Sequence, residues 1–346
     1  MLNKITKIVQ TEWKAQDIVL NTHVTGPKIE ILFQTSGYLT PSYETNSESH
    51  FLIMQGSFDP PTVTHFELLK KAVELKKNIN PSEPIDILLL LSLSHVDKRM
   101  NVLERSLLGY RIEMFELLLK QITKTTLNIP IALGLSNVAR YIDLIPGVMK
   151  KFHNSKSITF IMGIDVFKKV LDQKYYTRPL STVIPQIFQA NYFIAGRKEI
   201  TIENEFITFL KDRVSDLESV IDKVFFISMP EHSRFLSATL LRKKIAKEGI
   251  NKEANLHPVI LNYLKKHSLY SSSEEELAIL VTIQTVVRLG LEAKKEFSFT
   301  LEILNQLLSQ IKHSSSLQKK IIDEYIHEDN NTITRRWAEL LNQSLY

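Results

Sequence analysis

The chain has 346 residues, of which 44% are hydrophobic and 23% charged, with a net charge of +5 and no cysteine. The lack of cysteine excludes disulfide bonds, thiolate nucleophiles and cysteine-based zinc sites. No apolar run reaches the length of a membrane span, and the first residues lack the apolar core of a secretion signal, so we expect a cytoplasmic protein without a membrane partner.

Residues 1–50 precede the first strongly apolar segment and form an N-terminal segment of unknown role. Their pattern indicates a helix over residues 5–13, short strands over 18–23 and 29–34, and a polar linker over 45–50. The two strands are expected either at the edge of a sheet or in a small appended unit.

The apolar segment 51–55 leads directly into Gly56-Ser57-Phe58-Asp59-Pro60-Pro61-Thr62-Val63-Thr64-His65. This pattern indicates a buried strand that turns into a helix, with Thr62 as the N-cap and His65 on the first turn. The unpaired N–H groups and the positive dipole end at such a helix start favour a phosphate. Gly56 and Ser57 would let the backbone approach that ligand closely. The alternative is a plain tight turn with a partly exposed histidine.

A second motif, Ser237-Ala238-Thr239-Leu240-Leu241-Arg242, lies far along the chain after another β-rich segment. Ser237 or Thr239 can cap a helix, and Arg242 can hold phosphate oxygens with two N–H groups about one turn later. Alone, this motif describes an ordinary capped helix with a surface arginine. Together with the first motif, it indicates a nucleotide site.

Between residues 51 and 270, apolar segments alternate with amphipathic ones. Strands are expected at 51–55, 85–93, 129–135, 157–162, 191–195 and 224–228, and helices at 62–77, 103–120, 138–144, 164–171, 204–212, 237–248 and 257–267. Continuous apolar strands are typical of a parallel sheet covered on both faces. The alternation therefore predicts a doubly wound α/β fold that binds ligands outside the carboxyl ends of its strands.

The two motifs resemble the signatures of the HxGH-type nucleotidyltransferase superfamily, Gly-x-Phe-x-Pro-x-Thr-x-x-His and Ile-Ser-x-Thr-x-x-Arg, with Leu236 in place of isoleucine. The segments between them are similar in order to those of nicotinate and nicotinamide mononucleotide adenylyltransferases: Lys98 after a strand, Arg111-x-x-Met114, Gly163-x-Asp165, and a strand ending near Arg197. A tryptophan common in that family after Gly-x-Asp is replaced here by Lys174-Tyr175-Tyr176.

This resemblance implies an enzyme of NAD biosynthesis that joins the 5′-phosphate of nicotinate or nicotinamide mononucleotide to the AMP moiety of ATP and releases pyrophosphate. It implies catalytic roles for His65, Thr62, Arg242 and Lys98. It implies ATP or phosphate contacts for Gly56, Ser57, Phe58, His65, Ser237, Thr239, Arg242, Gly163, Asp165 and Arg197, and mononucleotide contacts for Ser57, Lys98 and Arg111. No residue is expected to bind a metal, because Mg²⁺ arrives on ATP with mostly water ligands.

Other readings remain open at this point. Within the superfamily, the alternatives are adenylyl transfer to phosphopantetheine and cytidylyl transfer to a phospho-alcohol. A non-catalytic nucleotide-binding scaffold is the alternative of a different class. A nucleic-acid partner is not expected, since the positive charge lies where phosphates of a nucleotide would bind.

After residue 270 the pattern becomes helical throughout. Ser273 is expected to cap a helix that begins with Glu274-Glu275-Glu276, and further helices are expected at 297–312, 317–327 and 333–345. Residues 271–346 hold eight Lys and Arg against eleven Asp and Glu, so the positive excess lies in residues 1–270. The expected division is an N-terminal segment (1–50), a catalytic domain (51–270) and a helical extension (271–346) that mediates homo-oligomerisation or docking, or simply covers the core.

Overall fold

The computed structural model describes residues 2–20, 29–34, 48–93, 106–125, 129, 131–196, 202–214, 218–230, 238–250, 255–270, 273–327 and 331–343. The chain forms two compact units. Unit 1 combines Met1–Val24, Arg99–Phe115 and Ala238–Tyr346, and unit 2 combines Thr25–Lys98 and Glu116–Ser237. No helix in the described part of the chain is long and apolar enough to cross a membrane.

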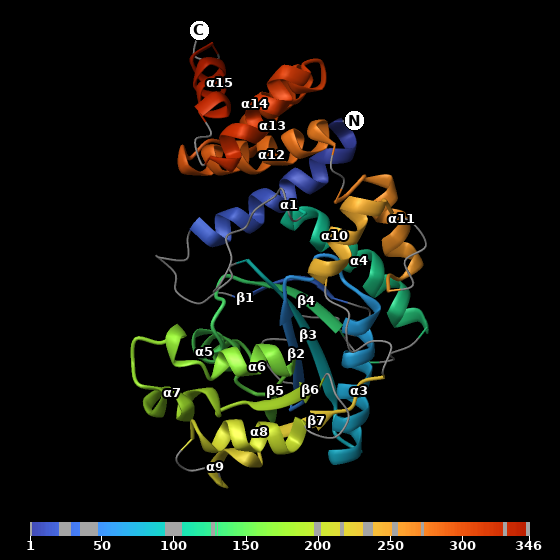
Figure 1. Ribbon diagram of the computed structural model, residues 1–346, viewed down its shortest axis with the longest axis vertical. Helices are drawn as coiled ribbons and strands as arrows, with labels where there is room; N and C mark the ends of the chain where they lie inside the picture. The colour runs from blue at the N-terminus through green and yellow to red at the C-terminus, as the bar shows by residue number, and fades with distance from the viewer. Residues whose placement is uncertain are drawn as a thin grey trace. The chain divides into compact units, whose positions relative to one another are not determined.

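Unit 2 is built on a seven-stranded sheet with the order β1-β4-β3-β2-β5-β6-β7 (Figure 1). The strands are β1 (Ile29–Gln34), β2 (His50–Gly56), β3 (Ile85–Ser92), β4 (Ile131–Ser136), β5 (Ser157–Gly163), β6 (Asn191–Ala195) and β7 (Val224–Ile227). All neighbours are parallel except β1, which pairs antiparallel with β4. From β2 onward this is the strand order of a doubly wound α/β fold, which confirms the predicted fold class.

The strand order reverses between β2 and β5, and there the sheet opens. The ladder between these strands ends at Ile53 and Phe160. Beyond that point β2 continues to Gly56 paired only with β3, and β5 continues to Gly163 paired only with β6. In open α/β sheets, ligands bind in the crevice at such a reversal, outside the carboxyl ends of the strands. In the described sheet, this reversal lies beside Gly56 and Gly163, which makes the position a candidate site.

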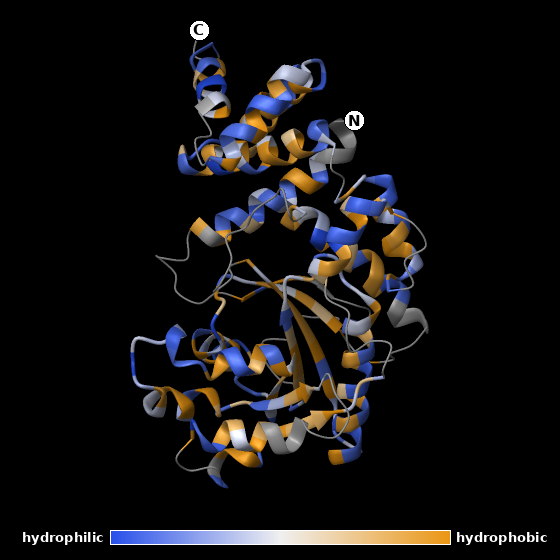
Figure 2. Cartoon of the chain, viewed as in Figure 1, coloured by the Kyte–Doolittle hydropathy of each residue, from blue (hydrophilic) through white to orange (hydrophobic). Residues whose placement is uncertain are grey.

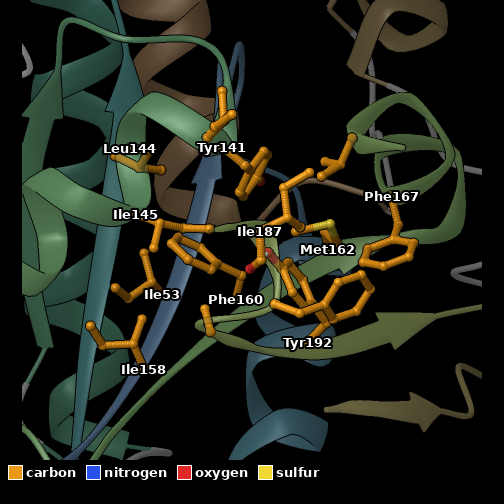
Figure 3. Packing of buried hydrophobic residues seen from close by; sticks show 14 of the residues in the cluster. Ile53, Tyr141, Leu144, Ile145, Ile158, Phe160, Met162, Phe167, Ile187 and Tyr192 are labelled. Carbon is orange, nitrogen blue, oxygen red and sulfur yellow. The ribbon is translucent and has the colours of Figure 1, made fainter. Parts of the chain in front are cut away.

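Helices cover both faces of this sheet, as continuous apolar strands require. They are α3 (Val63–Ile79), α5 (Tyr141–Lys151), α6 (Ile164–Val170), α7 (Leu180–Ile187), α8 (Ile202–Lys211), α9 (Glu218–Ile221) and the short 3₁₀ turn Gln173–Tyr175. Helices α5 to α9 pack with Ile53, Phe160 and Tyr192 in one buried cluster (Figure 3), whereas α3 contributes no residue to that cluster and contacts β2, β5 and β7. The strands of the sheet are mostly hydrophobic, with a few polar residues (Figure 2).

Unit 1 is entirely helical in its described part. It comprises α1 (Leu2–Leu20), the first part of α4 (Leu108–Thr125), α10 (Ala238–Glu248), α11 (Pro258–Lys266), α12 (Glu274–Glu292), α13 (Phe297–Lys312), α14 (Ser315–Ile326) and α15 (Asn331–Gln343). Helix α12 contacts α1, α13, α14 and α15. The predicted cap of α12 is confirmed, because the Ser273 hydroxyl accepts from the Glu276 N–H.

Several expectations are corrected by the fold. The predicted strand over residues 18–23 is wrong for 18–20, which continue α1, and residues 21–23 lie outside the described chain. These residues stay helical because α1 packs against α12 and α13, which favours one long helix over a separate strand. The strand at 29–34 is confirmed as an edge strand. Helix α7 went unpredicted because Pro185 lies inside it, and an internal proline argues against a helix.

The compact units do not follow the boundaries expected at residues 50 and 270. Helices α10 and α11, assigned by sequence to the catalytic domain, group with α1 and the C-terminal helices in unit 1. The three-part division by function stays a prediction. Its N-terminal segment is nevertheless shared between the units, since α1 belongs to unit 1 and β1 to unit 2.

Candidate active site at the strand-order reversal

The loop that follows β2 is filled by the side chain of Phe58. A Cβ atom added to Gly56 would lie 3.4 Å from Cζ of the Phe58 ring, and that ring is 2% exposed. The Cβ side of Gly56 therefore faces the Phe58 ring rather than open space, and the contact of Gly56 with a ligand stays a prediction. The contact between Phe58 and a nucleotide, which the resemblance implies, likewise stays a prediction.

The end of β5 is open, in contrast to the end of β2. A Cβ added to Gly163 would meet no atom within 4 Å. Gly163 precedes α6 as its N-cap residue, and Asp165 lies exposed on the first turn of that helix. A ligand can approach the main chain of β5 at this point, and the exposed carboxylate of Asp165 can accept hydrogen bonds from it.

Helix α3 begins as predicted, with Thr62 at the N-cap and His65 three residues later. Thr62 has an extended backbone, and its N–H donates to Nδ1 of His65 over 3.0 Å. The Thr62 hydroxyl lies 2.8 Å from the same nitrogen. The arrangement is a capping box in which histidine replaces the usual glutamate or glutamine. The helix start therefore fixes the imidazole ring as well as the backbone.

These contacts decide which nitrogen of His65 carries the proton. A backbone N–H can only donate, so Nδ1 must accept, and the proton of the neutral ring is assigned to Nε2. Burial lowers the pKa of His65 from 6.5 to about 4. His65 is therefore a neutral hydrogen-bond donor near pH 7. Such a group can stabilise negative charge on an oxygen without first taking up a proton.

Thr239 and Arg242 of the second motif belong to unit 1. Thr239 lies on the first turn of α10, and its hydroxyl accepts from Nη2 of Arg242 over 3.3 Å. Arg242 is buried in this unit rather than exposed as a surface arginine. The contact between Thr239 and Arg242 confirms that this helix start brings the two side chains together, while their contacts with ATP stay a prediction.

Arg111 lies on the first turn of α4, also in unit 1, and is fully buried. The carboxylate of Glu12 from α1 accepts from the Gly109 N–H at the start of the same helix over 3.2 Å. Burial raises the pKa of Glu12, and the hydrogen bonds from Gln16 and Gly109 and the charge of Arg111 oppose that rise. The role of Arg111 in binding the mononucleotide stays a prediction. Glu12 was missed, although an acid on the apolar face of α1 was a visible signal.

The structure thus collects one group of the expected residues at the carboxyl ends of β2 and β5 in unit 2. That group comprises Gly56, Ser57, Phe58, Thr62, His65, Gly163 and Asp165. Thr239, Arg242 and Arg111 belong to unit 1. Lys98, Arg197 and Ser237 lie outside the described residues.

No protein-family model and no curated protein matches the chain. Among solved structures, it is similar to Plasmodium falciparum nicotinic acid mononucleotide adenylyltransferase complexed with NaAD, with 22% identity over 64% of this chain and 97% of that one, at a TM-score of 0.45. The same enzyme complexed with APC gives 20% identity, the same coverage and a TM-score of 0.44. A candidate nicotinate-nucleotide adenylyltransferase from Vibrio parahaemolyticus gives 13% identity over 65% of this chain and 97% of that one, at 0.36.

Proposed function

We propose that the protein is an adenylyltransferase that joins the 5′-phosphate of nicotinate or nicotinamide mononucleotide to the AMP moiety of ATP. The observation that supports this most directly is the neutral His65, whose Nε2 proton is available at a helix start beside the reversal of strand order. The sequence motifs that resemble the mononucleotide adenylyltransferases support the choice of substrates.

In the proposed reaction, an oxygen of the mononucleotide 5′-phosphate attacks the α-phosphorus of ATP. A new phosphorus–oxygen bond forms, the bond to the bridging oxygen of the β-phosphate breaks, and pyrophosphate leaves with its Mg²⁺. The attacking phosphate is already anionic near pH 7, so no general base is needed. Catalysis then consists of positioning and of stabilising charge on the transferred group.

His65 supplies that stabilisation in the proposal. Its Nε2–H donates to a non-bridging α-phosphate oxygen, whose negative charge increases in the transition state. Thr62 holds the ring through Nδ1, so the donor direction is set before the substrate binds. Asp165 would accept from a ribose hydroxyl. The phosphate roles of Arg242, Thr239, Ser237, Lys98 and Arg197 are carried over from the sequence resemblance.

The test incubates purified full-length protein with ATP, Mg²⁺ and a panel of acceptor phosphates, and measures the release of pyrophosphate. Nicotinate and nicotinamide mononucleotides, phosphopantetheine and, with CTP, phosphocholine are compared, and His65→Ala is the control for contaminating activity. Release that requires a pyridine mononucleotide and His65 supports the proposal. Release with another acceptor only would assign a different nucleotidyltransferase, and ATP binding without release would indicate a scaffold.

A further inference from the structure

Phe58 adopts a backbone conformation that is rare for a bulky side chain. Its φ is 43°, in the left-handed region that usually contains glycine or asparagine. This turn folds the ring back onto the end of β2, where it packs over Gly56 with its Cζ atom 3.4 Å from the position of an added Cβ. Strained backbone persists where the surroundings hold it and is concentrated at functional sites. The turn at Phe58 is therefore a candidate functional feature.

The ring of Phe58 contacts the imidazole of His65. Their centroids are 5.1 Å apart and their planes meet at 68°, an edge-to-face arrangement that aromatic pairs favour. Thr62 holds the other side of the imidazole through its N–H and hydroxyl. The imidazole is thus held by hydrogen bonds at Nδ1 and by contact with an apolar ring.

We propose that Phe58 is a positioning residue for His65, because its buried ring sets the plane of the imidazole and shields the imidazole from water. This inference rests on the proposed function, in which the Nε2 proton is donated to the α-phosphate. A positioning residue of this kind acts on the transition state. Its loss lowers kcat and kcat/KM together and leaves the KM values nearly unchanged.

The test compares two buried phenylalanines of unit 2. Phe58→Leu keeps an apolar side chain but removes the ring next to His65, and Phe206→Leu removes an equally buried ring from the packing of α8. We expect Phe58→Leu to lower kcat by about tenfold or more, with both KM values within about twofold, since small misplacements of a catalytic group are costly. Phe206→Leu should leave kcat within about twofold of the native value, because its ring packs on Phe167, Phe209 and Phe226.

The second readout is the pKa of His65, measured by NMR on protein labelled at histidine and assigned with His65→Ala. Native protein should give a value of about 4, and Phe58→Leu should give a higher value because water reaches the ring. If leucine prevents folding, Phe58→Met is measured in the same way. An unchanged kcat, or an unchanged pKa of His65 in the folded variant, overturns the inference. If the native protein transfers no adenylyl group, the proposed function fails, and the pKa of His65 in the Phe58→Leu variant still decides whether Phe58 shields the imidazole from water.

Discussion

The two compact units differ in how far apart in the sequence their contacting segments lie. Unit 2 is organised by one sheet, whose parallel strands follow one another with a helix between most neighbours. Unit 1 is assembled from three segments far apart in the chain, including α1 at one end and α12 to α15 at the other. The strands of unit 2 can therefore be predicted from the local residue pattern. The grouping of helices in unit 1 cannot, because it depends on which helix faces pack together across large distances in the sequence.

Two close contacts illustrate how unit 1 is assembled. A Cβ added to Gly290 of α12 would lie 2.5 Å from the Thr300 hydroxyl of α13 and 2.9 Å from the ring of Trp13 in α1. Glu12 of α1 binds the start of α4, and Gln16 of the same helix donates both to Glu12 and to the Gln284 carbonyl of α12. Helix α1 therefore joins α4 to the C-terminal helices within unit 1.

The largest effect is expected at the site of unit 2. His65→Ala should lower kcat by about 10²–10³-fold, the scale for loss of one preorganised donor to a transition state. The free energy of unfolding should fall by only about 1 kcal/mol, the scale for losing a capping contact at a helix start. Pyrophosphate release under saturating substrates measures the effect. His153→Ala, which removes an exposed histidine of the same unit, serves as control, and equal activity of both variants would contradict the assignment of His65.

The pH dependence of stability should also reveal the environment of His65. Its pKa is lowered to about 4 in the folded protein and is near 6.5 when unfolded. As the pH falls, the unfolded state therefore takes up the proton before the folded state does. The contribution of the neutral imidazole to the stability of the folded state is complete above pH 6.5 and is lost as the pH falls towards 4. We expect native protein to lose up to about 3 kcal/mol more than His65→Gln over this interval. Urea unfolding of both proteins from pH 7.5 to 4 measures it, and parallel curves would mean that the imidazole is not buried.

Alanine substitution of one glycine in each unit tests whether the two positions differ in packing. Gly290→Ala should destabilise unit 1 by about 1–3 kcal/mol, because the added methyl group overlaps Thr300 and Trp13. Gly163→Ala should leave thermal unfolding nearly unchanged, since open space surrounds that position. The same variant should raise the KM for ATP if a nucleotide approaches the end of β5. The reverse order of stabilities would show that the packing of α1, α12 and α13 is not as described.

A smaller effect is expected from removing the carboxylate that α1 provides to α4. Glu12→Ala should destabilise the protein by about 1–2 kcal/mol, the scale for losing a helix cap. Asp143→Ala is the matched control in unit 2, where Asp143 accepts from Arg140 over 2.7 Å on an exposed helix start, and it should cost less than about 1 kcal/mol. Chemical unfolding measures both. Equal losses would indicate that α1 contributes little to the start of α4.

Most of the sheet and the start of α3 could be predicted from the order of residues in the chain. Strands β2, β3 and β5 to β7 were predicted to within one residue at each end, because their apolar runs end near glycine, proline or charge. Strand β4 was predicted to within two residues, and β1 with its observed bounds. The cap at Thr62 and the place of His65 followed from the order of residue types alone. These features depend on neighbours in the chain, which is why pattern reveals them.

Only the tertiary structure decided how distant segments meet. It paired β1 antiparallel with β4, extended α1 through residues 18–20, and grouped α1 with the C-terminal helices. At the site, it placed the Phe58 ring over Gly56 and assigned the His65 proton to Nε2 through the Thr62 N–H. Periodicity identifies the face that a helix or strand buries, but it does not identify the partner. The partner is selected by packing and by hydrogen bonds that exist only in the folded chain.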